Sequence, residues 1–417
     1  GPAAVRVGRA AAYACSMRDP RLDRLADVLV RYSTRVKPGD LVHINSEAVA
    51  MPLIVATYEA VLRAGGNPFW SPRSEELQEA MLTHASEEQL RFVSPLDIHR
   101  TQSIDVHIAF WAELNTKFLG RIDPKRTAML QSARKPIMKI FMERCAASAE
   151  DRMDAYGRKG IRWCGTLFPT LAAAQDAEMS LNQYEAFVFR AGLLHLPDPV
   201  KAWEAISERQ QRVVDYLTGK KELRFRAPPT DGHDGTDLRV DVSKAHWINC
   251  AGRENFPDGE VFAGPTLPAD GGFGASGHAN FTFPAVYQGR EVEGVRLKFE
   301  NGKVVDAAAK KNEEFLIRML DQDAGARIMG EIAIGTNYAI TEFSRNTLFD
   351  EKIGGTFHMA VGAGYPESGN SNESGLHWDM VCDLRPRAAC AGGSITADGE
   401  VFHKDGQFQP VVKGWAQ

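Results

Sequence analysis

Apolar strands alternate with amphipathic helices over roughly the first 165 residues, and this alternation constrains the fold more than any other feature. The strand patterns cover 41–45, 68–70, 104–110 and 160–164. Between them lie helical patterns, at 52–64 and about 123–147, and another follows Asp19-Pro20, where Asp19 is a predicted N-cap and Pro20 the first helical residue. Strands that alternate with helices are typical of a parallel α/β sheet.

The pattern changes after Lys221. A helix-rich connector from about 170 to Lys220 ends in a regular helical pattern over 200–218. Beyond it, short segments alternate polar and apolar residues, glycine becomes frequent, and 313–326 is the clearest remaining helical pattern. The fold class predicted is therefore α/β plus α+β. Residues 17–220 are predicted to form an N-terminal parallel α/β domain with its connector, and residues 221–417 a mostly antiparallel, β-rich domain.

The N-terminus and the bulk composition limit the classes of function. Gly1-Pro2 resembles the remnant of a cleaved tag, and the weakly apolar stretch that follows is too short for a signal peptide, so residues 1–16 are interpreted as a tag remnant or non-native leader. The formal net charge is −5, and the longest apolar run is far below about 18 residues, so we expect no nucleic-acid partner and no membrane association. Six scattered cysteines without a CxxC pair predict reduced thiols and a cytoplasmic protein.

Residues 375–385 predict a strand with one functional face. His377, Asp379 and Asp383 share one side of this strand, and the opposite side is apolar. An imidazole and a carboxylate two residues apart can bind one metal ion, although an edge strand with a solvated polar face has the same pattern. Asp383 lies six residues, about 20 Å along an extended chain, beyond His377, so we interpret it as structural.

Further acidic and imidazole side chains after residue 255 supply the other possible ligands. With the strand pair, the candidate set is Glu260, Glu331, Glu351, His358, His377 and Asp379. Glu331 and His358 lie in apolar segments, where a charged group needs a partner, although a lone buried histidine or a surface glutamate is the commoner case. Two histidines and four carboxylates suit zinc, cobalt or manganese, and such a set can bind two ions. The pentapeptide DGEVF around Glu260 recurs around Glu400, where hairpin residues predict a surface position.

Four motifs in this order resemble the metallo-aminopeptidases of the aminopeptidase T and aminopeptidase S type. They are Asn255–Pro265 (NFPDGEVFAGP), Gly330–Asn337 (GEIAIGTN), Phe349–Pro366 (FDEKIGGTFHMAVGAGYP) and His377–Arg385 (HWDMVCDLR), and the likeness runs from Asp19 almost to the C-terminus. The resemblance implies a dinuclear enzyme, usually a homodimer, that releases N-terminal residues from short peptides through a metal-activated water.

The same resemblance implies roles for single residues. Glu260, Glu331, His358, His377 and Asp379 would be ligands, and Tyr365 a hydrogen-bond donor near the scissile carbonyl. Glu260 or Glu331 would carry the proton to the leaving amine. Glu351 would be a ligand or would support one, whereas its neighbours Asp350 and Lys352 also suit an ordinary solvated turn.

Three alternatives remain open. The fold also resembles that of 2,5-dihydroxypyridine dioxygenases, which use one ferrous ion and two histidines with one carboxylate. Such an enzyme should have a histidine in place of Glu260 and should not need Glu331. A specialised amide hydrolase, or a binding protein without catalysis, could share the same motifs.

The glycine-rich segment 270–277 lacks a GK[ST] sequence and predicts a bulged β connection rather than a phosphate site.

Overall fold

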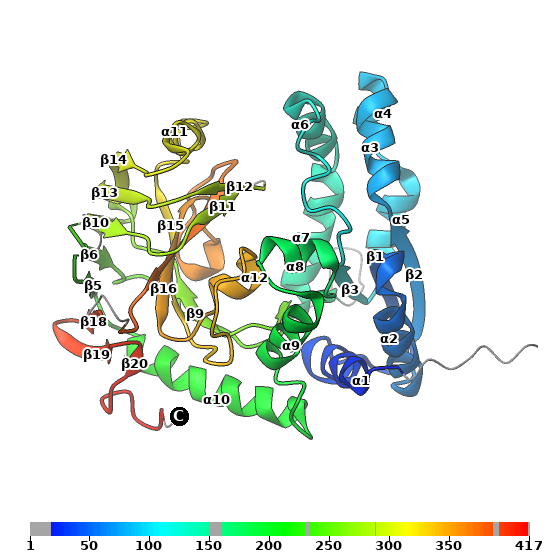
Figure 1. The fold of residues 1–417 in the computed structure, drawn as a ribbon, viewed down its shortest axis with the longest axis horizontal. Coiled ribbons are helices and arrows are strands. Elements are labelled where there is room, and N and C mark those ends of the chain that lie inside the picture. The colour runs from blue at the N-terminus through cyan, green and yellow to red at the C-terminus, as the bar shows by residue number, and fades with distance from the viewer. Residues whose placement is uncertain (1–17, 150–159, 230–233, 288, 387–391, 416–417) are drawn as a thin grey trace, which may run out of the picture.

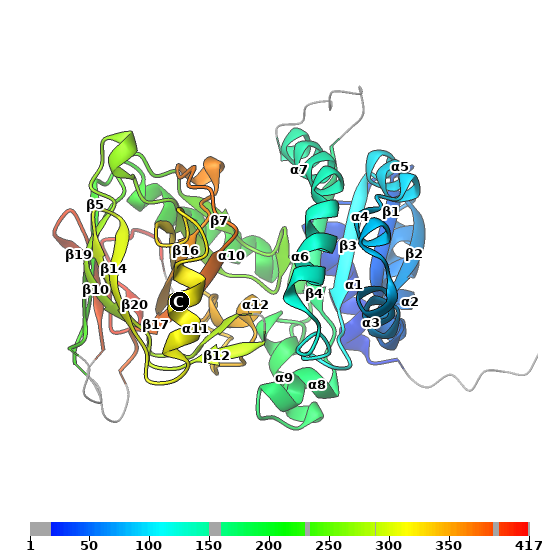
Figure 2. The same cartoon turned by 90° about the horizontal axis from the view of Figure 1, so that it is seen from above.

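The computed structural model describes residues 18–149, 160–229, 234–287, 289–386 and 392–415 (Figure 1). The predicted leader, residues 1–16, lies outside the described residues. A parallel sheet with helices occupies one half of the molecule and antiparallel sheets occupy the other, as both views show (Figures 1 and 2). This arrangement confirms the predicted fold class.

The N-terminal sheet has five parallel strands in the order β2-β1-β3-β4-β8. Their bounds are Leu41–Glu47 (β1), Asn67–Arg73 (β2), Val106–Trp111 (β3), Arg162–Leu167 (β4) and Asn255–Phe256 (β8). The last strand comes from beyond residue 221 and pairs with β4, so a segment of the later sequence completes the first sheet.

Helices surround this sheet and form the connector to the second half. They are α1 (Pro20–Asp27), α2 (Met51–Arg63), α3 (Glu75–His84), α4 (Glu87–Arg91), α5 (Pro95–Ser103), α6 (Pro124–Ala133), α7 (Lys135–Ala149), α8 (Leu171–Asp176), α9 (Leu181–Ala191) and α10 (Pro199–Leu217), with a π-helical turn at Val28–Ser33 and a 3-10 turn at Ala48–Ala50. Asp19 caps α1 and Pro20 is its first residue, as predicted. The helical region predicted over about 123–147 is observed as two helices, α6 and α7, which are separated at Arg134. Pro136 explains the break, because it has no N–H to donate to the preceding turn and its ring crowds the carbonyl of Ser132, four positions earlier.

The larger antiparallel sheet has eight strands in the order β14-β13-β10-β6-β5-β18-β19-β20. Their bounds are Glu222–Ala227 (β5), Thr236–Asp241 (β6), Ala275–Asn280 (β10), Arg296–Glu300 (β13), Lys303–Ala308 (β14), Ser394–Ala397 (β18), Glu400–Lys404 (β19) and Gln407–Phe408 (β20), and a separate hairpin joins Ala285–Tyr287 (β11) to Arg290–Val292 (β12). Asp398 and Gly399 both have positive φ in the turn between β18 and β19, which confirms the predicted hairpin. The helix predicted over 313–326 is too long, since α11 covers Glu313–Leu320 and ends at the polar turn that follows.

A second antiparallel sheet, β17-β16-β15-β9-β7, lies between the larger sheet and the N-terminal half. Its strands are Ile248–Cys250 (β7), Glu260–Ala263 (β9), Met329–Gly335 (β15), Thr356–Gly362 (β16) and His377–Asp383 (β17). One face is apolar and shares a core with the larger sheet, where the rings of Phe225 and Phe357 lie 4.5 Å apart. The other face points away from that core.

The segment around α12 (Thr347–Asp350) covers this second face and joins the two halves. Leu348, Phe349 and Ile353 belong to the hydrophobic core of the N-terminal half rather than to that of the antiparallel sheets. Figure 1 shows α12 between the two halves. Among the described residues, the helices lack the combination of length and hydropathy needed to cross a lipid bilayer.

Candidate metal centre

Four adjacent strands bring five of the six candidate ligands to one face of the second antiparallel sheet. Glu260 begins β9, Glu331 lies in β15, His358 in β16, and His377 and Asp379 in β17. In the strand register Glu331, Ala360 and Asp379 form one row, so the carboxylates flank a small side chain. Alternation sends the neighbouring Ile332, Met359, Trp378 and Met380 into the core on the opposite face. The two-faced strand predicted over 375–385 is therefore observed, with the bounds His377–Asp383.

A β-bulge determines where Glu331 points. The pairing of β15 with β16 shifts register between Met329 and Glu331, so Gly330 is an extra residue. A Cβ atom at Gly330 would lie only 2.3 Å from the carbonyl oxygen of Ala363, so the close approach of the backbone requires glycine. Bulges commonly redirect a side chain beside an active site, and this one turns Glu331 toward the other ligands.

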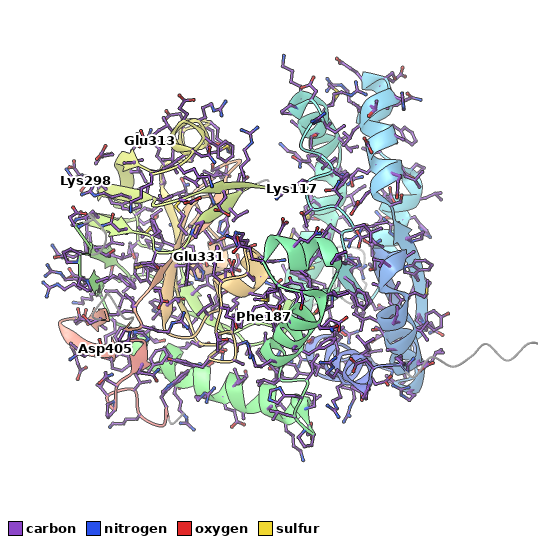
Figure 3. The ribbon with its side chains drawn as sticks, viewed as in Figure 1. Lys117, Phe187, Lys298, Glu313, Glu331 and Asp405 are labelled. Carbon is purple, nitrogen blue, oxygen red and sulfur yellow. The ribbon has the colours of Figure 1, made fainter. Side chains whose placement is uncertain are left out.

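Glu351 comes from α12 instead of from the sheet. It is the C-cap residue of α12, which is held against the N-terminal half by a contact between the rings of Phe187 and Phe349, 5.1 Å apart. Phe187 and Glu331, both labelled in Figure 3, belong to the two different halves. The alternative of a solvated turn is wrong, because Asp350 is 4% exposed and Lys352 is 1% exposed. The glycines Gly354 and Gly355 that follow Lys352 are themselves tightly packed, against Tyr338 and Gly406.

The six candidate side chains form three overlapping groups of potential ligands. Within each group, one donor atom from each residue lies within 4.8 Å of the others; the groups are Glu260, Glu331 and His358; Glu331, His377 and Asp379; and Glu351, His358 and Asp379. Glu331 is shared by the first two. Its Oε1 lies 3.3 Å from His358 Nε2, and its Oε2 lies 3.6 Å from His377 Nε2. A carboxylate in this position has one oxygen for each side of the centre.

The donor set suits divalent cations. Asp379 Oδ1 is buried and has no hydrogen-bond partner among the described residues, which is costly for a carboxylate oxygen. Glu260 Oε2 is also buried, 3.2 Å from His358 Nε2. His377 donates a hydrogen bond from Nδ1 to the carbonyl oxygen of Ala363 at 2.8 Å, so Nε2 is the atom that faces the carboxylates. This contact to a carbonyl, with Nδ1 protonated, is the usual way to orient a metal-binding imidazole. Mixed carboxylate and imidazole ligands fit zinc, cobalt or manganese.

The charges in the centre interact strongly. Burial alone would raise the pKa of Glu260, but the Lys352 ammonium and the His358 imidazole beside it outweigh burial and lower that pKa to about 2. Burial would lower the pKa of His377, but the adjacent Asp379 and Glu331 carboxylates raise it to about 10. The imidazoles therefore hold protons that divalent cations would displace on binding.

Tyr365 lies at the rim of the centre. Its ring makes an edge contact with His377, with centroids 5.1 Å apart, and a second edge contact with Phe262. The side chain is 38% exposed, while burial of its hydroxyl raises the pKa of the phenol. A protonated hydroxyl next to the ligand set can donate a hydrogen bond to a bound substrate.

Asp383 and Glu400 resemble the candidate ligands in sequence but lie outside the groups of potential ligands. Asp383 binds Arg385 at 2.8 Å and lies outside the ligand groups found in the described residues, as predicted for a structural residue. Glu400, the counterpart of Glu260 in the repeated pentapeptide, is exposed and accepts a hydrogen bond from Tyr216 at 3.0 Å. Residues 271–274 form a turn into β10, in agreement with the predicted β connection.

Sequence reasoning missed two charged residues at the centre. Lys352 Nζ lies 2.7 Å from Glu260 Oε1 and 2.5 Å from Glu351 Oε1. Asp258 lies behind them with its Oδ1 4.0 Å from the same ammonium, and it accepts hydrogen bonds from the N–H groups of Gly252 and Gly259. The available signal was the position of Lys352 directly before Ile353-Gly354-Gly355, a sequence typical of a buried segment.

Comparisons with known proteins agree with this geometry. The family model described as thermophilic metalloprotease (M29) matches residues 18–408. "Aminopeptidase 2" of Geobacillus stearothermophilus is 28% identical over 95% of this chain and 98% of its own length. The structure of wild-type AmpT from Thermus thermophilus superposes with a TM-score of 0.74 at 24% identity, covering 93% of this chain and 99% of that one.

A second solved structure shares the fold at greater distance. The 2,5-dihydroxypyridine dioxygenase from Pseudomonas putida KT2440 gives a TM-score of 0.56 at 13% identity, over 93% of this chain and 96% of that one. At such low identity the likeness concerns the fold alone.

Proposed function

The chain belongs to the thermophilic metalloprotease (M29) family of metallo-aminopeptidases, and we propose on this premise that it releases N-terminal residues from short peptides at a dinuclear metal centre. The observation that carries the proposal is the convergence of all six candidate ligands, from four strands and one helix end, within overlapping groups. A mononuclear dioxygenase would need only two histidines and one carboxylate. Glu260 and Glu331 are both present in the centre, and this favours the hydrolase.

Two divalent ions, of zinc, cobalt or manganese, would share Glu331. Glu260 and His358 lie on one side of that carboxylate, and His377 and Asp379 lie on the other. Glu351 completes the set beside His358 and Asp379. Metal ions held there would activate a water molecule and polarise the scissile carbonyl.

The protein's own side chains would transfer the proton, donate a hydrogen bond to the carbonyl and bind the α-amine of the peptide. Glu260 or Glu331 takes the proton of the attacking water and delivers it to the leaving amine. The Tyr365 hydroxyl donates a hydrogen bond to the carbonyl oxygen as charge develops on it. The free α-amine of the peptide binds at the carboxylate-rich end of the centre, which limits cleavage to the first residue.

We further propose a cytoplasmic homodimer. The family resemblance supports the dimer, and four cysteines among the described residues without disulfides support a reducing compartment. Light scattering on the purified protein tests the oligomeric state directly.

The decisive experiment combines metal analysis with a panel of aminoacyl anilides in the presence of Co²⁺, Zn²⁺ or Mn²⁺. We expect two ions per chain and metal-dependent release of the aniline from these substrates. Glu260→Gln should lose at least about 100-fold in kcat, because it changes a candidate ligand that is also one of the two candidates for proton transfer. Glu400→Gln is the matched control, since it changes the same pentapeptide at an exposed site, and it should leave kcat unchanged.

Two results would contradict the proposal. One iron per chain with no anilide turnover would favour the dioxygenase chemistry. Full metal-dependent peptidase activity in Glu331→Gln would contradict the role assigned to that glutamate.

A further inference from the structure

Lys352 is buried inside the candidate metal centre. Its side chain is 2% exposed, and its ammonium contacts Glu260 Oε1 at 2.7 Å and Glu351 Oε1 at 2.5 Å. A buried ammonium is strongly destabilising unless charged partners and hydrogen bonds compensate for its lost hydration. The fold therefore buries a charge at the centre, although a neutral residue would lose less hydration on burial.

Lys352 binds one oxygen of each of two carboxylates, those of Glu260 and Glu351. A carboxylate has two oxygens, and the ammonium takes one oxygen of Glu260 and one of Glu351. The other oxygen of Glu260, Oε2, lies 3.2 Å from His358 Nε2 in a group of potential ligands. Lys352 thus fixes the orientation in which Glu260 faces the metal position.

The local charges give the ammonium a second effect. Five acidic side chains gather here: Asp258, Glu260, Glu331, Glu351 and Asp379. Carboxylates this close repel one another in a buried site, where the repulsion is weakly screened. Lys352 lies next to three of them, Asp258, Glu260 and Glu351.

We propose that Lys352 is a positioning residue of the metal centre, an internal cation that holds Glu260 and Glu351 by one oxygen each, keeps the ligands assembled before metal binds, and leaves the opposite oxygens for the metal. The inference rests on the proposed metal centre and adds to it a residue whose contacts are with the ligands rather than with substrate.

The test compares Lys352→Met, which keeps the unbranched shape and removes the charge, with the wild-type chain. In metal-free protein we expect Tm to fall by at least about 5 °C, because the carboxylates lose their buried partner. The fall should be smaller in protein loaded with Co²⁺, since the metal replaces the missing charge. The visible absorption of bound Co²⁺ should also change, because both carboxylates gain a second oxygen for coordination.

Two further variants separate charge from packing. The double variant Glu351→Gln/Lys352→Met removes one of the carboxylates left without a partner, so its metal-free Tm should recover part of the loss. It also keeps the test informative if Lys352→Met alone fails to fold. Lys298→Met is the matched control, because it removes an exposed lysine paired with Glu300 at 3.1 Å, and it should change neither Tm nor the spectrum.

Each failure has its own signature. Equal losses of Tm with and without Co²⁺, an unchanged spectrum and no recovery in the double variant would show that Lys352 only fills space. If wild-type protein binds no divalent metal, the proposed function fails, while the metal-free comparison of the single and double variants still decides whether Lys352 holds the carboxylates.

Discussion

Glu331 lies between the two histidines of the centre. One of its oxygens lies 3.3 Å from His358 Nε2 and the other lies 3.6 Å from His377 Nε2, and the residue belongs to two of the three groups of potential ligands, as His358 and Asp379 also do. Burial raises the pKa of this carboxyl, whereas the hydrogen bond with His358 opposes the shift. A buried carboxylate needs charged partners, and Glu331 has an imidazole beside each of its oxygens. This arrangement is well suited to bridge two cations.

Tyr365→Phe tests the one catalytic role assigned outside the ligand set. The tyrosine ring contacts His377 by its edge, so phenylalanine should keep the packing and lose only the hydroxyl. We expect kcat to fall roughly 10²-fold or more, as when one donor to a developing oxyanion is removed. Metal content and Tm should stay at the wild-type values, and a loss of metal would contradict the role as a hydrogen-bond donor.

His403 predicts a pH dependence of stability that is independent of the metal centre. It is fully buried in β19, and burial lowers its pKa to about 3, while an exposed histidine titrates near 6.5. Between these values the unfolded chain binds the proton and the folded chain does not, so stability falls as pH is lowered through this window. The slope is about 1.4 kcal/mol per pH unit for one such group.

Urea unfolding at pH 7, 6, 5 and 4 checks this prediction. His403→Leu should show a shallower loss of stability than wild type over that range. Parallel curves for the two proteins would mean that His403 takes up no extra proton on unfolding. His43 and His107, whose pKa values are also lowered by burial, remain in both proteins and cancel in the comparison.

Single residues were predictable where their chemistry is unusual for their surroundings. Glu331 and His358 interrupt apolar runs, and His377 and Asp379 alternate correctly along a strand, so the sequence was enough to propose them. Lys352 was not predictable in this way, because its partners lie 1 and 92 positions away and only the folded chain brings both carboxylates to one buried ammonium.

At the scale of elements, the bulge in β15 directs Glu331 toward the other candidate ligands. Gly330 is the extra residue, and its lack of a side chain allows the carbonyl oxygen of Ala363 to approach closely. A regular register would shift Glu331 relative to its neighbours and face it away from His358.

Gly330→Ala should therefore disturb the centre without touching a ligand. The added methyl group would collide with backbone, and we expect a loss of about 1–3 kcal/mol in stability together with weaker metal binding. Competition with a chromophoric chelator measures the metal affinity. Gly375→Ala is the control, since its nearest neighbours are movable side-chain atoms 3.3 Å or more away, and unchanged affinity in both variants would contradict the role of the bulge.

Elements were predicted well where periodicity is local. The parallel strands, α10 and the Asp398-Gly399 hairpin follow from patterns within a few residues. The break between α6 and α7 depended on the weight given to Pro136, and the two-residue strand β8 has too few residues for any pattern. Its pairing with β4 is a property of the assembled sheet.

At the scale of the whole molecule, the N-terminal half helps to build the metal centre that the second half carries. Glu351 is fixed by α12, and α12 packs through Phe349 on Phe187 of α9. Residues of both halves therefore position Glu351, so a change in the core of the first half should alter the site in the second.

Phe187→Ala tests this coupling. We expect a loss of about 3–5 kcal/mol in stability from the cavity and roughly 10-fold weaker metal binding, because Glu351 loses its support. Phe299→Ala removes a phenylalanine that is 1% exposed in the larger antiparallel sheet, so it should destabilise the fold to a similar extent with unchanged affinity. Equal metal affinity in the two variants would show that α12 holds Glu351 without the N-terminal half.

Strand β8 has a consequence for how the protein is made. A ribosome extends the chain from the N-terminus, and the parallel sheet lacks its fifth strand until Asn255 and Phe256 have left the exit tunnel. Glu260, the first candidate ligand, follows only four positions after Phe256. Pairing of β8 with β4 on the nascent chain would therefore fix the backbone four residues before the first candidate ligand.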